Sequence, residues 1–385
     1  MILEGIFYSK YMLFSDYSGN MYAYDYSTCT EKKKRGFENN NPCLYFAESN
    51  DGSIYYLKQY YNGNALTNYY SYKYDFNTST PESIEITQSN QNFFDGYYDS
   101  STDIYWVARK NYDGIKYSLY LYKGTDEYNT GITNKDFENC VIRGKNLYYS
   151  SGVNPIGYAT FDYTTGAATV ITTKPLSDFG VSGEVTDMAV LENGIVAVLI
   201  RDANASSTYD LNTPYFVTYT YNVENNDTVT SRGALVLLSS DLSSYEVYGW
   251  TDSSRTIRAT LKNDSSDPYN GAPSNSQITS ITANIPEYEE RNSHFYGPMR
   301  IVAVRPKELV IADCGANFVL PDYNERKNGK MFTHNRLMTV DLRNFAISCK
   351  KEFSEDEIKF QNLAISGNLE SVTAGWTGLT AGDEK

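Results

Sequence analysis

The sequence predicts an all-β protein: a single β-propeller of six four-stranded blades, with seven blades as the alternative. The first observation is composition, because the 385 residues include 37 Tyr, 17 Phe and 3 Trp. Tyrosine favours pleated, half-buried surfaces and buries a large ring while it keeps a hydroxyl for water or a partner. The second is a strand–turn–strand unit that recurs about every 40–50 residues, the length of a propeller blade. The third is an Asp or Asn that closes most of these units.

Each unit contains an apolar strand, a pair of aromatic strands and a more polar fourth strand. In the second unit these are "CLYFAES", "SIYYLKQYY", "NYYSYKYDF" and "ESIEIT". A four-stranded sheet cannot bury both faces by itself, whereas radial packing against neighbouring blades buries them. The predicted blades cover residues 2–37, 42–88, 92–134, 137–173, 185–250 and 297–353.

Two segments do not follow the repeat. Residues 251–293 are polar and rich in turn-forming residues, so we expect a long insertion or a degenerate seventh blade. Residues 354–385 follow the last blade, and we expect this C-terminal tail to pack on the ring through 358–366, with its last ten residues loose.

Consecutive aromatic residues such as "IYYL" are predicted to be packing residues, because both faces of each blade are covered. Tyr60, Tyr61 and Tyr69 differ, since they flank the connection "NGNALTN" between two strands. A ligand could reach side chains at such a strand end. These three tyrosines are therefore the candidate binding residues.

The repeated acids are predicted to belong to turns and not to a catalytic site. Asp25, Asp75, Asp162 and Asp341 each close a unit, and the first three precede a Ser, Thr or Asn. An Asp at such a position accepts hydrogen bonds from its own downstream backbone, forming an Asx turn. The run "EKKKRG" at 31–36 is predicted to be a solvated edge strand whose lysines block strand association, with a phosphate or lipid contact as the alternative.

The segment "RIVAVRPKELVIADCG … NRLMTVDLRNF", within residues 300–345, resembles the blades of bacterial extracytoplasmic propellers of the NHL and YVTN-like type. The resemblance is carried by a structural motif, so it implies the propeller fold and no particular reaction. The uneven blade lengths, the excess of tyrosine and the long insertions depart from the family pattern. Because of these departures, the resemblance implies no shared ligand.

The formal net charge of -14 disfavours a nucleic-acid partner, because binding to phosphates requires clustered Lys and Arg. No stretch approaches the ~18 consecutive apolar residues of a membrane span. Composition favours an extracytoplasmic location, in the periplasm or on the cell surface, with a signal or lipid anchor preceding Met1. A cytoplasmic location is the alternative.

The cysteines give no metal motif. Five are present, and no two have CxxC spacing. Cys29 and Cys43 fall on strands of adjoining units, where they form either a disulfide or two buried thiols. The two histidines, His294 and His334, are too few for a three-His zinc site and are expected in surface loops.

Weak calcium candidates occur in "NDSSDPYNGA", which supplies Asp264, Asp267 and Asn270. Oxygen-rich loops bind calcium, but this one lacks the spacing and distal Glu of an EF-hand. The alternative is a polar loop without a metal. Glycine-rich phosphate-binding motifs are absent from the sequence, so no cofactor is predicted.

Without a complete catalytic constellation, the sequence favours a non-enzymatic binding or scaffold propeller of a bacterial envelope or surface. An unknown protein or glycan is the expected partner, and the acidic balance favours cationic or neutral ligands. The alternative is a carboxylate-based carbohydrate hydrolase or lyase acting in the central funnel. That activity requires two or three converging acids with perturbed pKa values.

Overall fold

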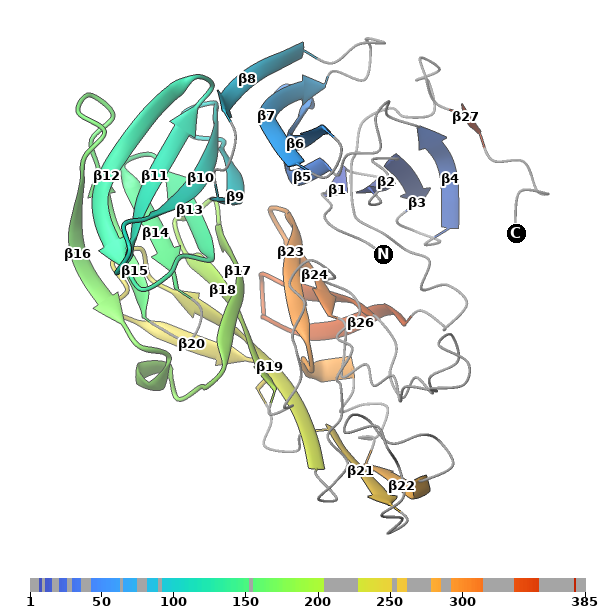
Figure 1. The fold of residues 1–385 in the computed structure, drawn as a ribbon. Helices are drawn as coiled ribbons and strands as arrows, with labels where there is room; N and C mark the ends of the chain where they lie inside the picture. Colours follow the sequence, from blue (N-terminus) through green and yellow to red (C-terminus); the bar gives the residue numbers. More distant parts are fainter. Residues whose placement is uncertain are drawn as a thin grey trace, which may run out of the picture.

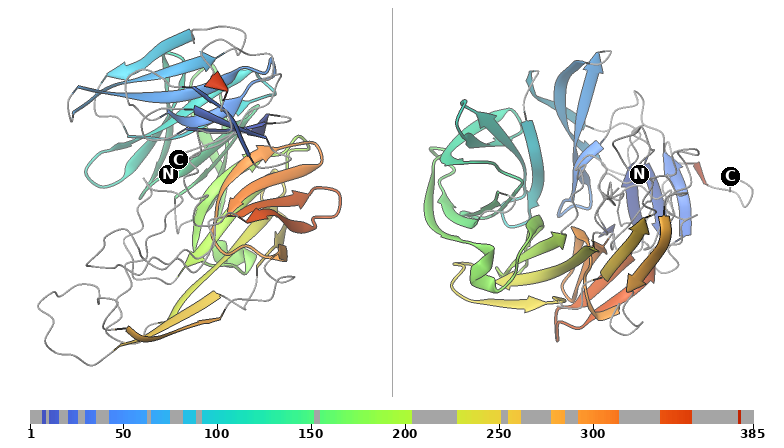
Figure 2. Two further views of the ribbon diagram at one scale, coloured as in Figure 1. Left: turned by 90° about the vertical axis from the view of Figure 1, so that its right-hand side faces the viewer. Right: turned by 60° about the horizontal axis from the view of Figure 1, so that its bottom comes forward.

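Six antiparallel β-sheets surround a common axis in the computed structural model (Figures 1 and 2). The inner strands of consecutive sheets contact one another in chain order from the second sheet to the last. This radial arrangement is that of a β-propeller, as predicted. The structure describes residues 7–8, 11–15, 21–25, 30–35, 43–62, 65–74, 82–88, 92–151, 155–203, 228–250, 255–261, 278–284, 292–313, 336–352 and 377–378.

Five blades are built from four consecutive strands, each paired antiparallel with the next. Their strands are β1 (Phe7–Tyr8), β2 (Tyr11–Ser15), β3 (Met21–Asp25), β4 (Thr30–Arg35); β5 (Cys43–Glu48), β6 (Ile54–Asn62), β7 (Ala65–Tyr74), β8 (Glu82–Gln88); β9 (Asn92–Asp99), β10 (Ile104–Tyr112), β11 (Tyr117–Lys123), β12 (Asp126–Asn134); β13 (Asn139–Arg143), β14 (Asn146–Ser150), β15 (Ile156–Phe161), β16 (Ala168–Lys174); and β23 (Pro298–Val304), β24 (Glu308–Asp313), β25 (Arg336–Asp341), β26 (Ile347–Glu352).

The remaining sheet does not follow the four-stranded plan. Its order is β17–β18–β19–β21–β22, and β20 also pairs with β19. The long strand β19 pairs with β20 through residues 235–238 and with β21 through residues 228–231, so the sheet branches. These strands are β17 (Glu184–Val190), β18 (Val196–Ala203), β19 (Thr228–Leu238), β20 (Tyr245–Tyr248), β21 (Arg255–Leu261) and β22 (Ile278–Asn284); a short 3-10 helix, η1 (Leu176–Phe179), precedes them.

The prediction of six four-stranded blades, and the alternative of seven, is therefore wrong. In the part of the chain that the structure describes, five blades are built on four consecutive strands, the first of them extended by one C-terminal strand, and the remaining sheet is larger and branched. The physical cause lies in residues 251–293, whose strands β21 and β22 extend the existing sheet along β19. Exposed backbone groups on a long strand are satisfied equally well by added strands, so a polar insertion continues a sheet without starting a new blade.

The first sheet contains strands from both ends of the chain. The C-terminal strand β27 (Thr377–Gly378) pairs antiparallel with Lys34 and Lys33 of β4 (Figure 1). The lysine-rich strand is thus not the last strand of its sheet, contrary to the prediction for 31–36. The rest of the C-terminal tail lies outside the described residues.

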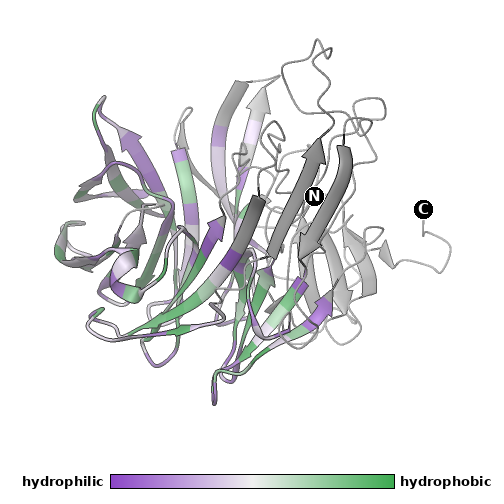
Figure 3. Ribbon diagram, turned by 90° about the horizontal axis from the view of Figure 1, so that it is seen from below, coloured by the Kyte–Doolittle hydropathy of each residue, from purple (hydrophilic) through white to green (hydrophobic). Residues whose placement is uncertain are grey.

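Both faces of the middle blades are buried, which explains their consecutive bulky residues. On β14, Leu147 and Tyr149 share a core with Trp106 of the preceding blade. Tyr148, between them in sequence, shares a different core with Val198 of the following sheet. Hydrophobic residues accordingly follow the strands around the ring (Figure 3). The prediction that these aromatic runs are packing residues is confirmed for β14.

The cores between sheets change composition around the ring. Between β5–β8 and β9–β12 the core is aromatic, whereas between the branched sheet and β23–β26 it is aliphatic. The tyrosine excess therefore reflects, in part, packing between blades. The buried aromatic residues of the first core are Tyr69, Phe93, Tyr98, Tyr105 and Tyr122, and the aliphatic core includes Ala197, Leu199, Leu235, Leu309 and Ile311.

Two of the repeated acids make the predicted turns. The carboxylate of Asp162 accepts the N–H of Thr164 at 2.8 Å and the hydroxyl of Thr165 at 3.0 Å. The carboxylate of Asp341 accepts the N–H of Arg343 at 2.9 Å. The Asx-turn prediction is confirmed at these two positions. The side chains of Asp25 and Asp75 lie outside the described part of the chain.

Candidate functional site

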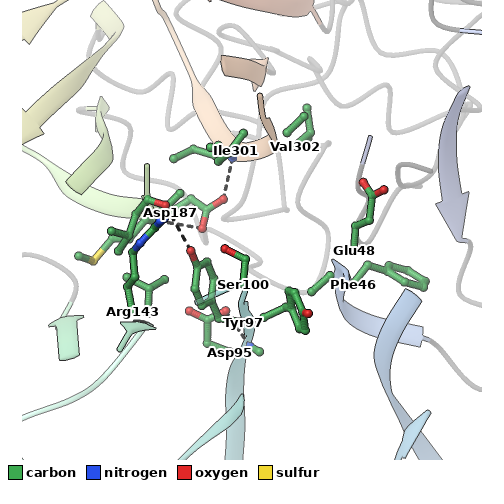
Figure 4. A pocket seen from close by; sticks show the side chains of 18 of the residues that line it. Phe46, Glu48, Asp95, Tyr97, Ser100, Arg143, Asp187, Ile301 and Val302 are labelled. Carbon is green, nitrogen blue, oxygen red and sulfur yellow. Dashed lines mark hydrogen bonds between the residues drawn. The ribbon is translucent and has the colours of Figure 1, made fainter. Parts of the chain in front are cut away.

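A pocket of about 330 Å³ lies on the axis of the ring, between the C-terminal halves of β5, β9, β13, β17 and β23 (Figure 4). This volume is at the lower end of the range for small-molecule pockets. Strands from five different sheets contribute to the wall. The pocket therefore exists only in the assembled ring.

Two aspartates of the wall bind the backbone of the next sheet. Asp95 on β9 accepts the N–H of Cys140 on β13 at 2.8 Å. Asp187 on β17 accepts the N–H of Ile301 on β23 at 2.6 Å (Figure 4). Each also accepts the N–H of the residue that follows it, at 2.9 Å and 2.8 Å respectively. The carboxylates thus satisfy buried backbone donors and join neighbouring inner strands.

An amide makes the corresponding connection between β13 and β17. The side chain of Asn139 donates to the carbonyl of Val185 at 3.1 Å and to the hydroxyl of Ser150 at 2.9 Å. A polar side chain on each of three inner strands therefore reaches forward to the inner strand of the next sheet. We call Asp95, Asn139 and Asp187 the forward latches.

The carboxyl of Asp187 is buried beside an arginine. Burial raises the pKa of its carboxyl above the ordinary value, while the charge of Arg300 and the N–H groups of Ile301 and Met188 oppose that rise. Nη1 of Arg300 lies 3.6 Å from Oδ1 of Asp187. The bound backbone donors give this carboxylate a structural role.

Tyr97 lines the pocket with its aromatic ring, and its hydroxyl is held by a hydrogen bond. Its hydroxyl donates to the carbonyl of Val190 at 3.4 Å, from β9 across to β17. Burial raises the pKa of Tyr97 to about 12, so the group stays a neutral phenol at physiological pH. It can orient a ligand but cannot supply a phenolate near neutrality.

Arg143, the last residue of β13, is held by main-chain carbonyls. Its Nη1 donates to the carbonyl of Leu191 at 2.8 Å, and its Nη2 donates to that of Glu192 at 3.0 Å. Among the described residues, no carboxylate lies within ion-pair distance of its guanidinium. A half-buried cation thus lines the pocket with its orientation fixed by neutral acceptors.

Two coupled glutamates lie at the opposite ends of β13 and β17 from the pocket. Burial raises the pKa of Glu138 to about 6, and the negative charges of Glu184 and Asp136 add to that rise. Burial also raises the pKa of Glu184, against the effect of Arg201, whose Nη1 lies 4.0 Å from Oε1 of Glu184. These carboxyl groups bind protons more tightly than free glutamates.

Replacing Glu138 by glutamine should change how stability depends on pH. Its folded-state pKa of about 6 exceeds the ordinary glutamate value of 4.5, so the folded state binds the proton more tightly. In the wild type, stability from this group is present below pH 4.5 and is lost as the pH rises through 6. The variant avoids that loss, which we expect to be about 1 kcal/mol after allowance for partial solvent exposure. Urea unfolding of the wild type and the variant at pH 4 and pH 7 measures this loss. If the free energy of unfolding changes equally with pH in both proteins, Glu138 does not have the raised pKa.

The tyrosines predicted to bind ligand do not line this pocket. Tyr69 is only 4% exposed and packs edge-on against Phe93 in the core between blades. The hydroxyl of Tyr60 lies 2.5 Å from that of Tyr72. Tyr61 belongs to β6, and its side chain is outside the described residues. A binding role for Tyr60, Tyr61 and Tyr69 stays a prediction.

The weak calcium candidates Asp264, Asp267 and Asn270 fall outside the described residues, as do Cys29 and His334. Within the described residues, no group of three or more His, Cys, Asp or Glu side chains could hold a metal ion. That part of the chain also contains no helix long and apolar enough to cross a membrane.

Sequence analysis did not single out the residues that shape the pocket. The signal was present, because the apolar inner strands "NFFDGYYD", "NCVIRG" and "EVTDMAV" contain Asp95, Asn139 and Asp187 respectively. A polar residue inside an otherwise buried strand requires a partner. That partner lies on the next sheet, which a single strand does not reveal.

Comparison with solved structures finds proteins of low sequence identity. A luciferin-regenerating enzyme is 10% identical, with 81% of this chain and 83% of that chain covered and a TM-score of 0.42. A protein of unknown function from Bacteroides caccae is 12% identical, with 92% and 98% covered and a TM-score of 0.42. The β-propeller domain of Cps50 (Swd1) from Myceliophteria thermophila is 8% identical, with 97% and 94% covered and a TM-score of 0.41.

A family model described as the TdpA C-terminal domain matches residues 255–362. This segment begins with β21 and includes the whole last blade, β23–β26. A search of curated proteins finds no match.

Proposed function

We propose that the protein is a non-enzymatic binding propeller of the bacterial cell envelope or surface, and that its central pocket holds a ligand or part of a partner. The pocket supports a binding role because five sheets converge on it. Its aspartates support binding over hydrolysis, because Asp95 and Asp187 accept backbone N–H groups from the next sheet. The extracytoplasmic part of the proposal rests on the resemblance of residues 300–345 to NHL and YVTN-like blades.

Filling the pocket should abolish binding without unfolding the ring. Val304 lies at the end of β23, lines the pocket and is 40% exposed, so Val304→Trp adds bulk where the wall meets solvent. Val170 on β16 is 46% exposed and does not line the pocket, so Val170→Trp is the matched control. A compound that binds the pocket should raise the melting temperature of the wild type and of Val170→Trp but not of Val304→Trp.

The probes for this experiment are maltose, cellobiose, chitobiose, trialanine and acetylated leucine peptides, titrated by calorimetry and by thermal shift. Binding that Val304→Trp leaves intact would place the ligand elsewhere on the ring. A wild type that binds none of these probes at millimolar concentration would count against a small-ligand pocket. The proposed function would then rest on a scaffold role alone.

A second candidate, a carboxylate-based carbohydrate hydrolase or lyase, is favoured by Glu138 and Glu184. They stand at the starts of adjoining inner strands, and a carboxyl with a pKa of about 6 is suited to general acid catalysis near neutrality. This activity would be supported if the wild type releases reducing ends or unsaturated sugars from polysaccharides and Glu138→Gln does not. Product formation that Glu138→Gln leaves unchanged would remove these residues from consideration.

A further inference from the structure

We propose that the central pocket recognises an α-carboxylate next to an apolar side chain, as found at the C-terminus of a peptide or in a free apolar amino acid. This inference rests on the proposed function, because it names the ligand chemistry of the same pocket. It is carried by one oriented arginine, by a second arginine across β17, and by the apolar surface beside them.

Arg143 supplies the anchor. A guanidinium has five N–H donors, and Nη1 and Nη2 of Arg143 each donate one hydrogen bond, to the neutral carbonyls of Leu191 and Glu192. Neutral acceptors fix the plane of the guanidinium but leave its charge uncompensated. Arginine in a fixed orientation binds carboxylates through two parallel hydrogen bonds, and the low-dielectric wall strengthens that pairing.

Arg300 brings a second positive charge to the same wall. Strand β17 contacts β13 on one side and β23 on the other, so Arg143 and Arg300 approach it from opposite flanks. The carboxylate of Asp187, 3.6 Å from Arg300, already accepts the backbone N–H groups of Met188 and Ile301. Arg143 and Arg300 thus place two positive charges beside β17, where the carboxylates of Asp187 and Glu192 also line the pocket. A carboxylate ligand held by these arginines differs from the cationic or neutral ligand expected from composition.

Apolar surface adjoins the two arginines. Ile301 and Val304 follow Arg300 on β23, line the pocket and are partly exposed. In an amino acid, the carbon that bears the carboxylate also bears the side chain. A ligand that pairs with the arginines through its α-carboxylate therefore places its side chain within reach of β23. A sugar acid would instead present hydroxyl groups to this apolar surface, at a cost in desolvation.

The wall formed by β5, on the opposite side of the pocket, can accept hydrogen bonds from the nitrogen of such a ligand. Figure 4 shows Glu48 and Phe46 of β5 across the pocket from Asp187 and Arg143. A carboxylate there accepts hydrogen bonds from an ammonium or amide N–H. The ligand is thereby oriented, with its carboxylate toward β13 and β23 and its nitrogen toward β5.

Matched probes test the carboxylate directly on the unmodified protein. N-acetyl-Ala-Leu with a free C-terminus should bind, and its C-terminal amide should bind roughly 10- to 100-fold more weakly, because the amide loses a charge-assisted pair. Binding of the acid should also weaken as NaCl rises from 0.05 to 0.5 M, since salt screens a partly exposed pair. Equal binding of acid and amide would overturn the proposal, and so would binding of glucuronic acid with no binding of the peptide acid.

Substituted variants then test whether Arg143 is the residue that binds the carboxylate. Arg143→Gln should weaken binding of N-acetyl-Ala-Leu roughly 10- to 100-fold and leave binding of its amide nearly unchanged. Arg343→Gln is the control, because Arg343 pairs with Asp341 in an exposed turn of the last blade. If Arg143→Gln fails to fold, Val304→Trp and the acid–amide comparison still decide the matter. Undiminished acid binding by folded Arg143→Gln would overturn the proposal.

The two ligand sources are separated by one further comparison. Free leucine binding as tightly as N-acetyl-Ala-Leu indicates an amino acid site, whereas preference for the acetylated peptide indicates a peptide C-terminus. If neither acid binds but maltose or cellobiose does, and Val304→Trp abolishes that binding, the proposed function stands and this inference fails. If no probe binds, both fail for small ligands.

Discussion

Replacing Asp313 by alanine is expected to lower the free energy of unfolding by about 3–5 kcal/mol. Asp313 ends β24, and its Oδ2 lies 2.7 Å from Nη2 of Arg336 on β25. Both side chains are at most 1% exposed. The same carboxylate accepts the N–H groups of Tyr296 and Gly297 at 2.9 and 3.0 Å. Removing it leaves a buried guanidinium without its counter-charge and two buried donors without their acceptor.

Urea unfolding of Asp313→Ala measures this loss, and Asp341→Ala is the matched control. Asp341 also pairs with an arginine of the last blade, but the Arg343 side chain is 70% exposed. A surface ion pair contributes about 0–1 kcal/mol, so we expect a small effect from Asp341→Ala. Similar losses in the two variants would show that the burial of the Asp313–Arg336 pair is energetically unimportant.

Gly157→Ala is expected to destabilise the protein by about 2–3 kcal/mol through overpacking. Gly157 on β15 pairs with Tyr149 on β14, and the ring of Tyr149 lies directly over it. An added Cβ would lie 2.1 Å from Cζ of that ring. Tyr149 is 3% exposed and belongs to the core shared with the preceding blade, so it cannot move without disturbing that core.

A double-mutant cycle isolates this clash. Tyr149→Ala removes the ring, so adding Gly157→Ala in that background should cost less than 1 kcal/mol, because the ring atoms nearest the new methyl group are then gone. Equal costs of Gly157→Ala with and without the ring would show that the glycine is required for backbone reasons. Chemical unfolding of the four proteins gives all the values.

Features that depend on neighbouring residues could be predicted from the sequence. The Asx turn of Asp162 is local, because the Asp and the groups it binds lie within three residues. The all-β class follows from strands whose consecutive residues are bulky, as at Leu147, Tyr148 and Tyr149, since both faces of such a strand are covered. These patterns require no knowledge of which sheet is next.

The number of four-stranded blades could not be predicted, because it depends on pairing over long distances. The strand "TVTSRGALVLL" looks like half of an extra hairpin, but it pairs with both β20 and β21. Gly233 lies between the two paired segments, where an added Cβ would be 2.2 Å from Cδ of Pro298. Nothing near Gly233 in sequence indicates this approach from β23.

The pocket was missed for a similar reason. Arg143, Asp187 and Arg300 lie on three different sheets, and more than 40 residues separate each from the next along the chain. Their proximity depends on the closure of the ring. The tyrosines of the β6–β7 connection were more conspicuous in the sequence because they cluster along the chain, but clustering along a strand mostly reflects its packing.

The forward latches bear on how such a ring can change over evolutionary time. Asp95, Asn139 and Asp187 each leave their own sheet to bind the inner strand of the next one. The sheets that contain β13 and β17 thus each supply one forward latch and receive one. A duplicate of either unit would bring its own latch and accept that of its predecessor. We therefore expect duplication of such a unit to keep the polar contacts between inner strands, so that blade number can change without redesign of the axis.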